Sequence, residues 1–129
     1  MNPNKDVNKS TKEENHSTLA RMHHLDVDWF DPIDRDLLLT IDGMIDALNI
    51  QPEIFPVPNG HVQFEYDTES DTENGSDSYL EFEFFPDKKV RMMMIQNANR
   101  PIHDMFELDV RRINQIVEMF FNGGKQCQS

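Results

Sequence analysis

Residues 79–85 read Tyr-Leu-Glu-Phe-Glu-Phe-Phe, and this stretch decides the fold that the sequence predicts. Leu80, Phe82 and Phe84 occupy alternate positions, with a glutamate between each pair. Alternation with a period of two is typical of a strand that buries one face and exposes the other. We therefore expect a half-buried strand here, with its carboxylates on the open side.

Two neighbouring segments, 61–66 and 90–95, show the same alternation. A slip of one residue in strand pairing would turn every apolar side chain outward, so the apolar faces fix the register. The predicted register places Phe82 opposite both Phe64 and Met92. On the other face it places Glu65 opposite Glu81, Gln63 opposite Glu83, and Glu83 opposite Arg91.

Helical periodicity flanks these strands on both sides. Residues 32–48 carry apolar side chains at helical spacing, and Asp31-Pro32 is typical of a helix start, with Asp34 placed for a capping box. A second apolar stripe predicts a helix over about 104–122 that ends at Gly123-Gly124. Three prolines make the linker 52–60 extended, and Asn59-Gly60 predicts a turn at its end.

The predicted fold class is α+β, a two-layer sandwich in the order helix, three-stranded antiparallel meander, helix (α-β-β-β-α). Residues 1–25 are polar, so we expect a flexible, disordered N-terminal tail there. We expect a single domain over 26–124 and a short C-terminal tail over 125–129.

Negative charge is concentrated in the first half of the predicted domain. Residues 26–87 hold seventeen carboxylates and only one Arg or Lys, Arg35, whereas the formal charge of the whole chain is −12. The rest of the chain is therefore slightly basic. Nonspecific binding to nucleic acid or to anionic lipid needs a basic surface, so this composition argues against both as direct partners.

The sequence offers little for catalysis or for a cofactor. The acidic loop 67–78 resembles a calcium loop in its alternation, but Thr72 and Ser78 stand where an EF-hand needs Gly and Glu. The histidines are dispersed, and no phosphate-binding loop, dinucleotide motif or serine elbow is present. We expect no enzyme activity, no metal and no cofactor.

Cellular location is indicated only weakly. Cys127 is the single cysteine, and no apolar run is long enough for a secretory signal or a membrane span. A cytoplasmic protein is the expectation.

The charge pattern predicts a small, non-enzymatic binding protein that inhibits or caps a basic nucleic-acid-handling protein. In charge and size the chain resembles phage-encoded nucleic-acid mimics, such as anti-restriction or anti-CRISPR inhibitors. One alternative is an antitoxin or immunity protein that neutralises a toxic enzyme. Another is a structural or adaptor protein that forms a homodimer through Met93, Ile95 and Phe85 on the sheet face. The predicted partner-binding residues are Glu65, Glu69, Asp71, Glu73, Glu81 and Glu83, followed by Asp42 and Asp46.

Overall fold

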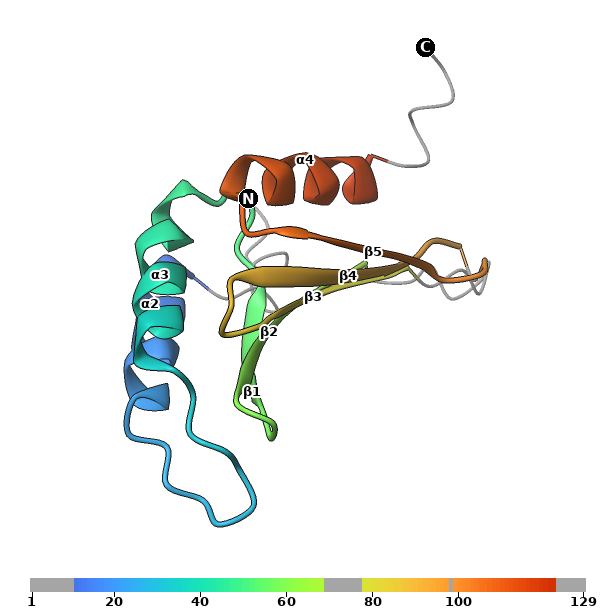
Figure 1. Cartoon of the computed structure of the whole chain (residues 1–129). Helices are drawn as coiled ribbons and strands as arrows, with labels where there is room; N and C mark the ends of the chain where they lie inside the picture. The colour runs from blue at the N-terminus through green and yellow to red at the C-terminus, as the bar shows by residue number, and fades with distance from the viewer. Residues whose placement is uncertain (1–10, 69–77, 98, 123–129) are drawn as a thin grey trace.

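A five-stranded antiparallel sheet with the strand order β1-β2-β3-β4-β5 forms the centre of the molecule (Figure 1). The computed structural model describes residues 11–68, 78–97 and 99–122. The strands are β1 (Glu53–Val57), β2 (His61–Asp67), β3 (Tyr79–Phe84), β4 (Lys89–Ile95) and β5 (Ile102–Glu107). The helices are α2 (Lys12–Met22), α3 (Arg35–Met44), which continues into the 3-10 turn η1 (Ile45–Ala47), and α4 (Val110–Phe121).

The register of the three central strands is the one that their apolar faces predict. Phe64 and Met92 lie opposite Phe82, while Glu65 lies opposite Glu81 on the other face. Phe64 and Phe82 are fully buried, and the adjacent Phe84 packs on Phe64 with ring centroids 4.5 Å apart. Aromatic packing of this kind makes a one-residue slip costly, because a slip of β3 would expose both Phe82 and Phe84.

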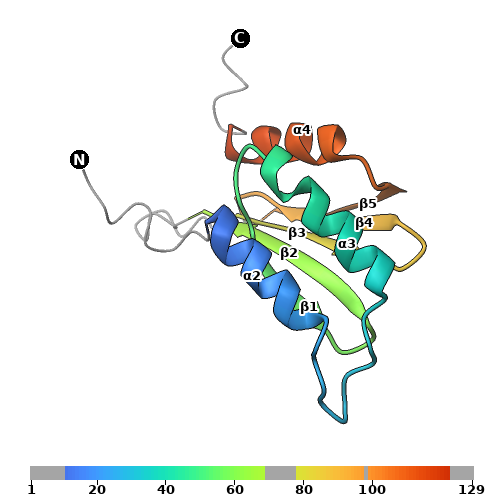
Figure 2. The same cartoon turned by 90° about the vertical axis from the view of Figure 1, so that its left-hand side faces the viewer.

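The three helices of the described residues lie on the same face of the sheet. Figure 2 shows α2 and α3 in front of the strands, and α4 crosses near β5. Each helix contributes an apolar side to the core: Leu19 and Met22 come from α2, Ile41 from α3, and Ile113 and Val117 from α4. This face is the inner face, and the opposite face, which no described helix covers, is the outer face.

The predicted three-stranded meander is wrong, because the sheet has five strands. The linker expected over 52–60 contains β1, which pairs with β2 despite Pro56. The start of the helix expected over 104–122 is β5, which pairs with β4, and α4 begins only at Val110. Phe106 satisfied both patterns, because it lies four residues before Val110 and also alternates with exposed neighbours.

The expectation of a flexible tail over 1–25 is wrong for Lys12–Met22, which form α2. Thr11 and Glu14 make a reciprocal capping box at its start, and Leu19 and Met22 are buried. Residues 1–10 and 123–129 lie outside the described residues. Helix α3 begins later than expected, because Asp34 rather than Asp31 accepts the capping hydrogen bond from the Leu37 N–H.

None of the helices in the described parts of the chain is long and apolar enough to cross a membrane.

Candidate functional site

The outer face carries three glutamates side by side on adjacent strands. Glu53 on β1 is paired with Glu65 on β2, and Glu65 is paired with Glu81 on β3. Neighbouring strands lie about 4.8 Å apart, so the three carboxylates form a line about 10 Å long across the sheet. We call Glu53, Glu65 and Glu81 the carboxylate row.

Two neutral side chains donate hydrogen bonds to glutamates of the row. The Gln63 amide donates from Nε2 to Glu65 Oε2 at 2.7 Å, and the Tyr79 hydroxyl donates to Glu81 Oε1 at 2.8 Å. Among the described residues, no lysine, arginine or histidine makes an ion pair with any of the three glutamates. Like charges on directly opposed strand positions repel, so the row is destabilising unless solvent or a partner compensates it.

The pKa of Tyr79 reflects the negative charge of the row. Burial raises the pKa of the Tyr79 phenol, and its hydrogen bond to Glu81 and the negative charges of Glu81 and Glu65 raise that pKa further. The phenol therefore stays protonated and remains a hydrogen-bond donor to the row. Tyr79 thus holds Glu81 in place without neutralising its charge.

Glu83, another predicted binding residue, is occupied within the fold. Its side chain is only 7% exposed, and it makes an ion pair with Arg91 and a hydrogen bond with His61. The imidazole of His61 donates from Nδ1 to Glu83 Oε2 at 2.6 Å. Burial by itself raises the pKa of Glu83, but the hydrogen bonds from His61 and Arg91 outweigh burial and hold the pKa below its ordinary value. Glu83 is therefore a neutralised, structural carboxylate.

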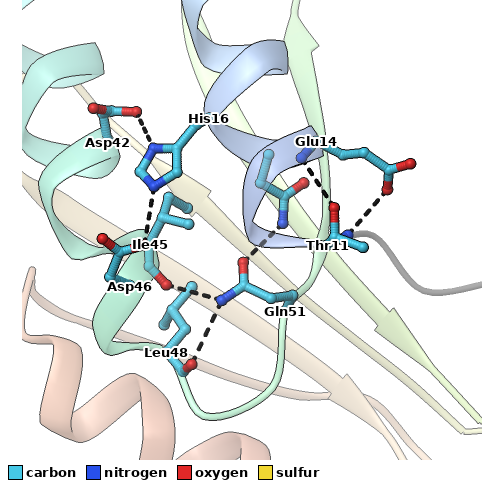
Figure 3. Close-up of polar contacts among 9 residues, drawn as sticks. Thr11, Glu14, His16, Asp42, Ile45, Asp46, Leu48 and Gln51 are labelled. Carbon is cyan, nitrogen blue, oxygen red and sulfur yellow. Dashed lines mark hydrogen bonds and ion pairs between the residues drawn. The ribbon is translucent and has the colours of Figure 1, made fainter. Parts of the chain in front are cut away.

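Asp42 and Asp46 belong to the helix layer and do not join the row. Figure 3 shows the His16 ring of α2 between them, with Nδ1 2.6 Å from Asp42 Oδ1 and Nε2 3.0 Å from Asp46 Oδ1. These hydrogen bonds raise the pKa of His16, first through Asp42 and then through Asp46. Both ring nitrogens donate only in the protonated imidazole, so the arrangement is an ion-paired contact between α2 and α3.

The remaining predicted binding residues, Glu69, Asp71 and Glu73, lie outside the described residues. Asp67, at the end of β2, is exposed and borders a small hollow that Glu53 and Glu65 also line. No group of three or more potential metal ligands is gathered within the parts of the chain that the structure describes.

The apolar side chains expected to form a self-association patch are only partly accessible. Met93 and Ile95 are half-buried on the outer face, and Phe85 packs against the His61 ring with centroids 4.3 Å apart. Nothing about their packing favours them over the row as a binding surface.

Glu53 is the site residue that the sequence analysis missed. The prolines of 52–60 predict an extended linker, in which Glu53 has no strand partner. Ile54 and Phe55 are consecutive apolar residues and Pro56 follows them, so the segment lacks the alternation that indicates a strand.

Comparison of the chain with models of protein families, with curated proteins and with solved structures finds no match. The function therefore has to be argued from the surface itself.

Proposed function

We propose that this chain is a non-enzymatic protein that binds a basic surface of a nucleic-acid-handling protein through its outer sheet face, and thereby inhibits it. The observation that carries the proposal is the carboxylate row, three adjacent glutamates without an ion pair in the described structure. A fold that leaves such a row uncompensated is less stable than one that pairs it. A cationic partner supplies the missing compensation.

The density of negative charge along the row is of the same order as that along a nucleic acid strand. Its glutamates lie about 4.8 Å apart, and a single strand of duplex DNA presents one phosphate charge for every about 3.4 Å of helix axis. A basic groove built to hold phosphates therefore meets a similar density of negative charge on this face. The formal charge of −12 adds long-range attraction that speeds the encounter.

The other acidic groups contribute to the long-range attraction of a partner rather than to direct contact with it. Glu83, Asp42 and Asp46 already have basic partners within the chain. They contribute to the overall field, but a partner that displaced their internal contacts would have to replace those contacts. We therefore place the contact surface at Glu53, Glu65 and Glu81, with Asp67 at its border.

The test uses two variants that change the net charge equally. In the row variant, Glu53, Glu65 and Glu81 are replaced by Gln. In the matched control, the exposed residues Asp26, Asp28 and Asp31 are replaced by Asn. Each variant and the wild-type chain are immobilised, and proteins are captured from a cell lysate at low salt.

The proposal predicts that the wild type and the control retain a nucleic-acid-binding enzyme, that the row variant does not, and that the soluble wild-type chain inhibits this enzyme. Equal retention by the row variant and the control would refute the assignment of the surface. Retention of a toxic enzyme that does not act on nucleic acid would replace the mimic hypothesis with the immunity-type alternative.

A further inference from the structure

The two edge strands of the sheet differ in the backbone groups that they offer to a partner. In an antiparallel pair, alternate residues direct their N–H and C=O groups to the neighbouring strand and away from it. The Thr68 N–H donates to the Ser78 carbonyl, so even-numbered residues of β2 direct their backbone groups to β3 and odd-numbered residues direct theirs to β1. The register pairs odd-numbered residues of β2 with odd-numbered residues of β1, whose backbone groups therefore face β2. Even-numbered residues of β1 therefore direct their backbone groups to the open edge.

Proline closes the β1 edge. Pro52, Ile54, Pro56 and Pro58 occupy the outward-directed positions in and beside β1, so three of these four positions lack an N–H. In addition, the Asn15 side chain of α2 donates from Nδ2 to the Pro52 carbonyl at 3.0 Å. Proline and a covering helix are both recognised ways in which proteins block strand addition at an edge.

Pro101 lies at an outward-directed position directly before β5, but within β5 itself there is no proline, and no side chain of a described helix bonds to its outward backbone groups. The Leu108 N–H donates to the Lys88 carbonyl at 2.9 Å, so even-numbered residues of β5 face β4 and His103, Met105 and Glu107 direct their backbone groups outward. All three carry an N–H, and the pairing with β4 runs without a bulge. The Met105 N–H is held by the neighbouring Asp104 side chain at 2.8 Å, a local contact that the carbonyl of an added strand can replace.

The side chains of β5 complement a second copy of the same strand. When two β5 strands pair antiparallel about a two-fold axis at Met105, the Met105 side chains meet, and each His103 faces Glu107 of the second copy. Glu107 also pairs with Lys89 of its own chain at 3.3 Å, but its side chain is 75% exposed and open to a second contact. Met105 is 51% exposed in the single chain, so this contact removes apolar surface from water. Centring the axis on Asp104 instead would place two aspartates opposite each other, a repulsive arrangement.

We propose that this chain forms a homodimer by pairing β5 with β5 of a second copy, in the register centred on Met105, which joins the two sheets into one. The charge distribution is compatible with this arrangement, because the region from Lys88 onward is net basic and the acidic strands β1 to β3 lie away from the axis. The outer faces with their carboxylate rows remain open. The dimer is therefore independent of the proposed function.

The main test is the substitution Met105→Pro, which gives β5 the protection that Pro56 gives β1. Because the Met105 N–H does not bond to β4, the variant keeps the intramolecular ladder. Sedimentation equilibrium should show a reversible dimer for the wild type and for the control Met105→Leu, and a folded monomer for Met105→Pro. A wild type that stays monomeric at every concentration, or a dimer that survives Met105→Pro, would overturn the proposal.

A charge-exchange experiment decides the register even if Met105→Pro fails to fold. His103→Glu places two glutamates opposite each other twice in the dimer and should weaken self-association about tenfold. Glu107→Lys removes the carboxylate that faces each His103 and should also weaken self-association. An equal mixture of the two variants should form a mixed dimer, because one cross-strand pair becomes Glu–Lys and the other stays His–Glu. Failure of the mixture to recover association would refute this register.

Salt separates this proposal from the proposed function. Two acidic chains repel each other, so added salt should strengthen the dimer, whereas it should weaken binding to a basic partner. A dimer that weakens steeply with salt would contradict pairing through β5.

Discussion

The inner and outer faces of the sheet differ in how their side chains are packed and paired. On the inner face, Phe64, Phe82 and Phe84 are completely buried under three helices. On the outer face, Glu53, Glu65 and Glu81 stand in line without an ion pair in the described structure. The difference indicates that the inner face supplies the stability of the fold, and that the outer face is arranged for something other than stability.

The outer face itself divides into a neutralised part and an open part. Glu83 lies two residues along β3 from Glu81, on the same face, and it has both Arg91 and His61 as partners. Arg91 and His61 therefore compensate a buried glutamate on this face, whereas no described basic side chain pairs with the row.

Phe82→Ala should have the largest effect on stability. The Phe82 side chain is fully buried among other aromatic rings, and its removal leaves a cavity that costs about 3–5 kcal/mol of unfolding free energy. The adjacent Glu81→Gln, on the outer face, should leave stability unchanged or raise it slightly, because it relieves repulsion with Glu65. Urea denaturation of the two variants checks this, and equal losses would show that the two faces are not distinct.

Glu83→Gln should destabilise the chain by about 1–3 kcal/mol, because charge-assisted hydrogen bonds to a buried carboxylate are lost. The low pKa of Glu83 also gives a pH signature. Its contribution is fully present above the ordinary value of 4.5 and is lost as the pH falls through the lower folded-state pKa.

The corresponding measurement is the pH dependence of the urea midpoint for the wild type, Glu83→Gln and Glu81→Gln. The stability difference between wild type and Glu83→Gln should shrink in acid. A difference that stays constant from neutral pH down to strong acid would argue against a charged Glu83 in the native state.

His16→Gln should have the smallest effect on stability. The pKa of His16 is raised, so its contribution is complete below about 6.5 and is lost as the pH rises through the folded-state value. A third of the side chain is exposed, so water screens the contact and the effect should be smaller than that of Glu83→Gln. Thermal melts at mildly acidic and alkaline pH measure it, with the exposed His24→Gln as control. An equal pH response in both variants would exclude a specific role for His16.

The central strands could be predicted from the sequence because a single physical rule sets them. Apolar residues at every second position fix both the face and the register, and Glu65 therefore had to lie opposite Glu81. The row was predicted in part for the same reason. Its third member, Glu53, was missed because β1 contains Pro56 and is held by its partner strand rather than by its own pattern.

The helix layer was harder to predict, since its polar contacts depend on tertiary structure. Helix α2 is mostly polar, and only the capping box of Thr11 and Glu14 signals its start. The position of His16 between Asp42 and Asp46 joins residues from two helices, and no local pattern in the sequence indicates it. The sequence predicts helix where β5 lies, because Phe106 fits the apolar spacing of α4.

The central claim, that the carboxylate row binds a basic partner, is tested most directly by the salt dependence of the captured partner's affinity. We predict that the affinity of the wild type and of the Asp26, Asp28 and Asp31 control falls steeply as salt rises, and that the row variant binds weakly with a much shallower dependence. Equal slopes for the row variant and the control would show that the partner senses only net charge, and would contradict the claim.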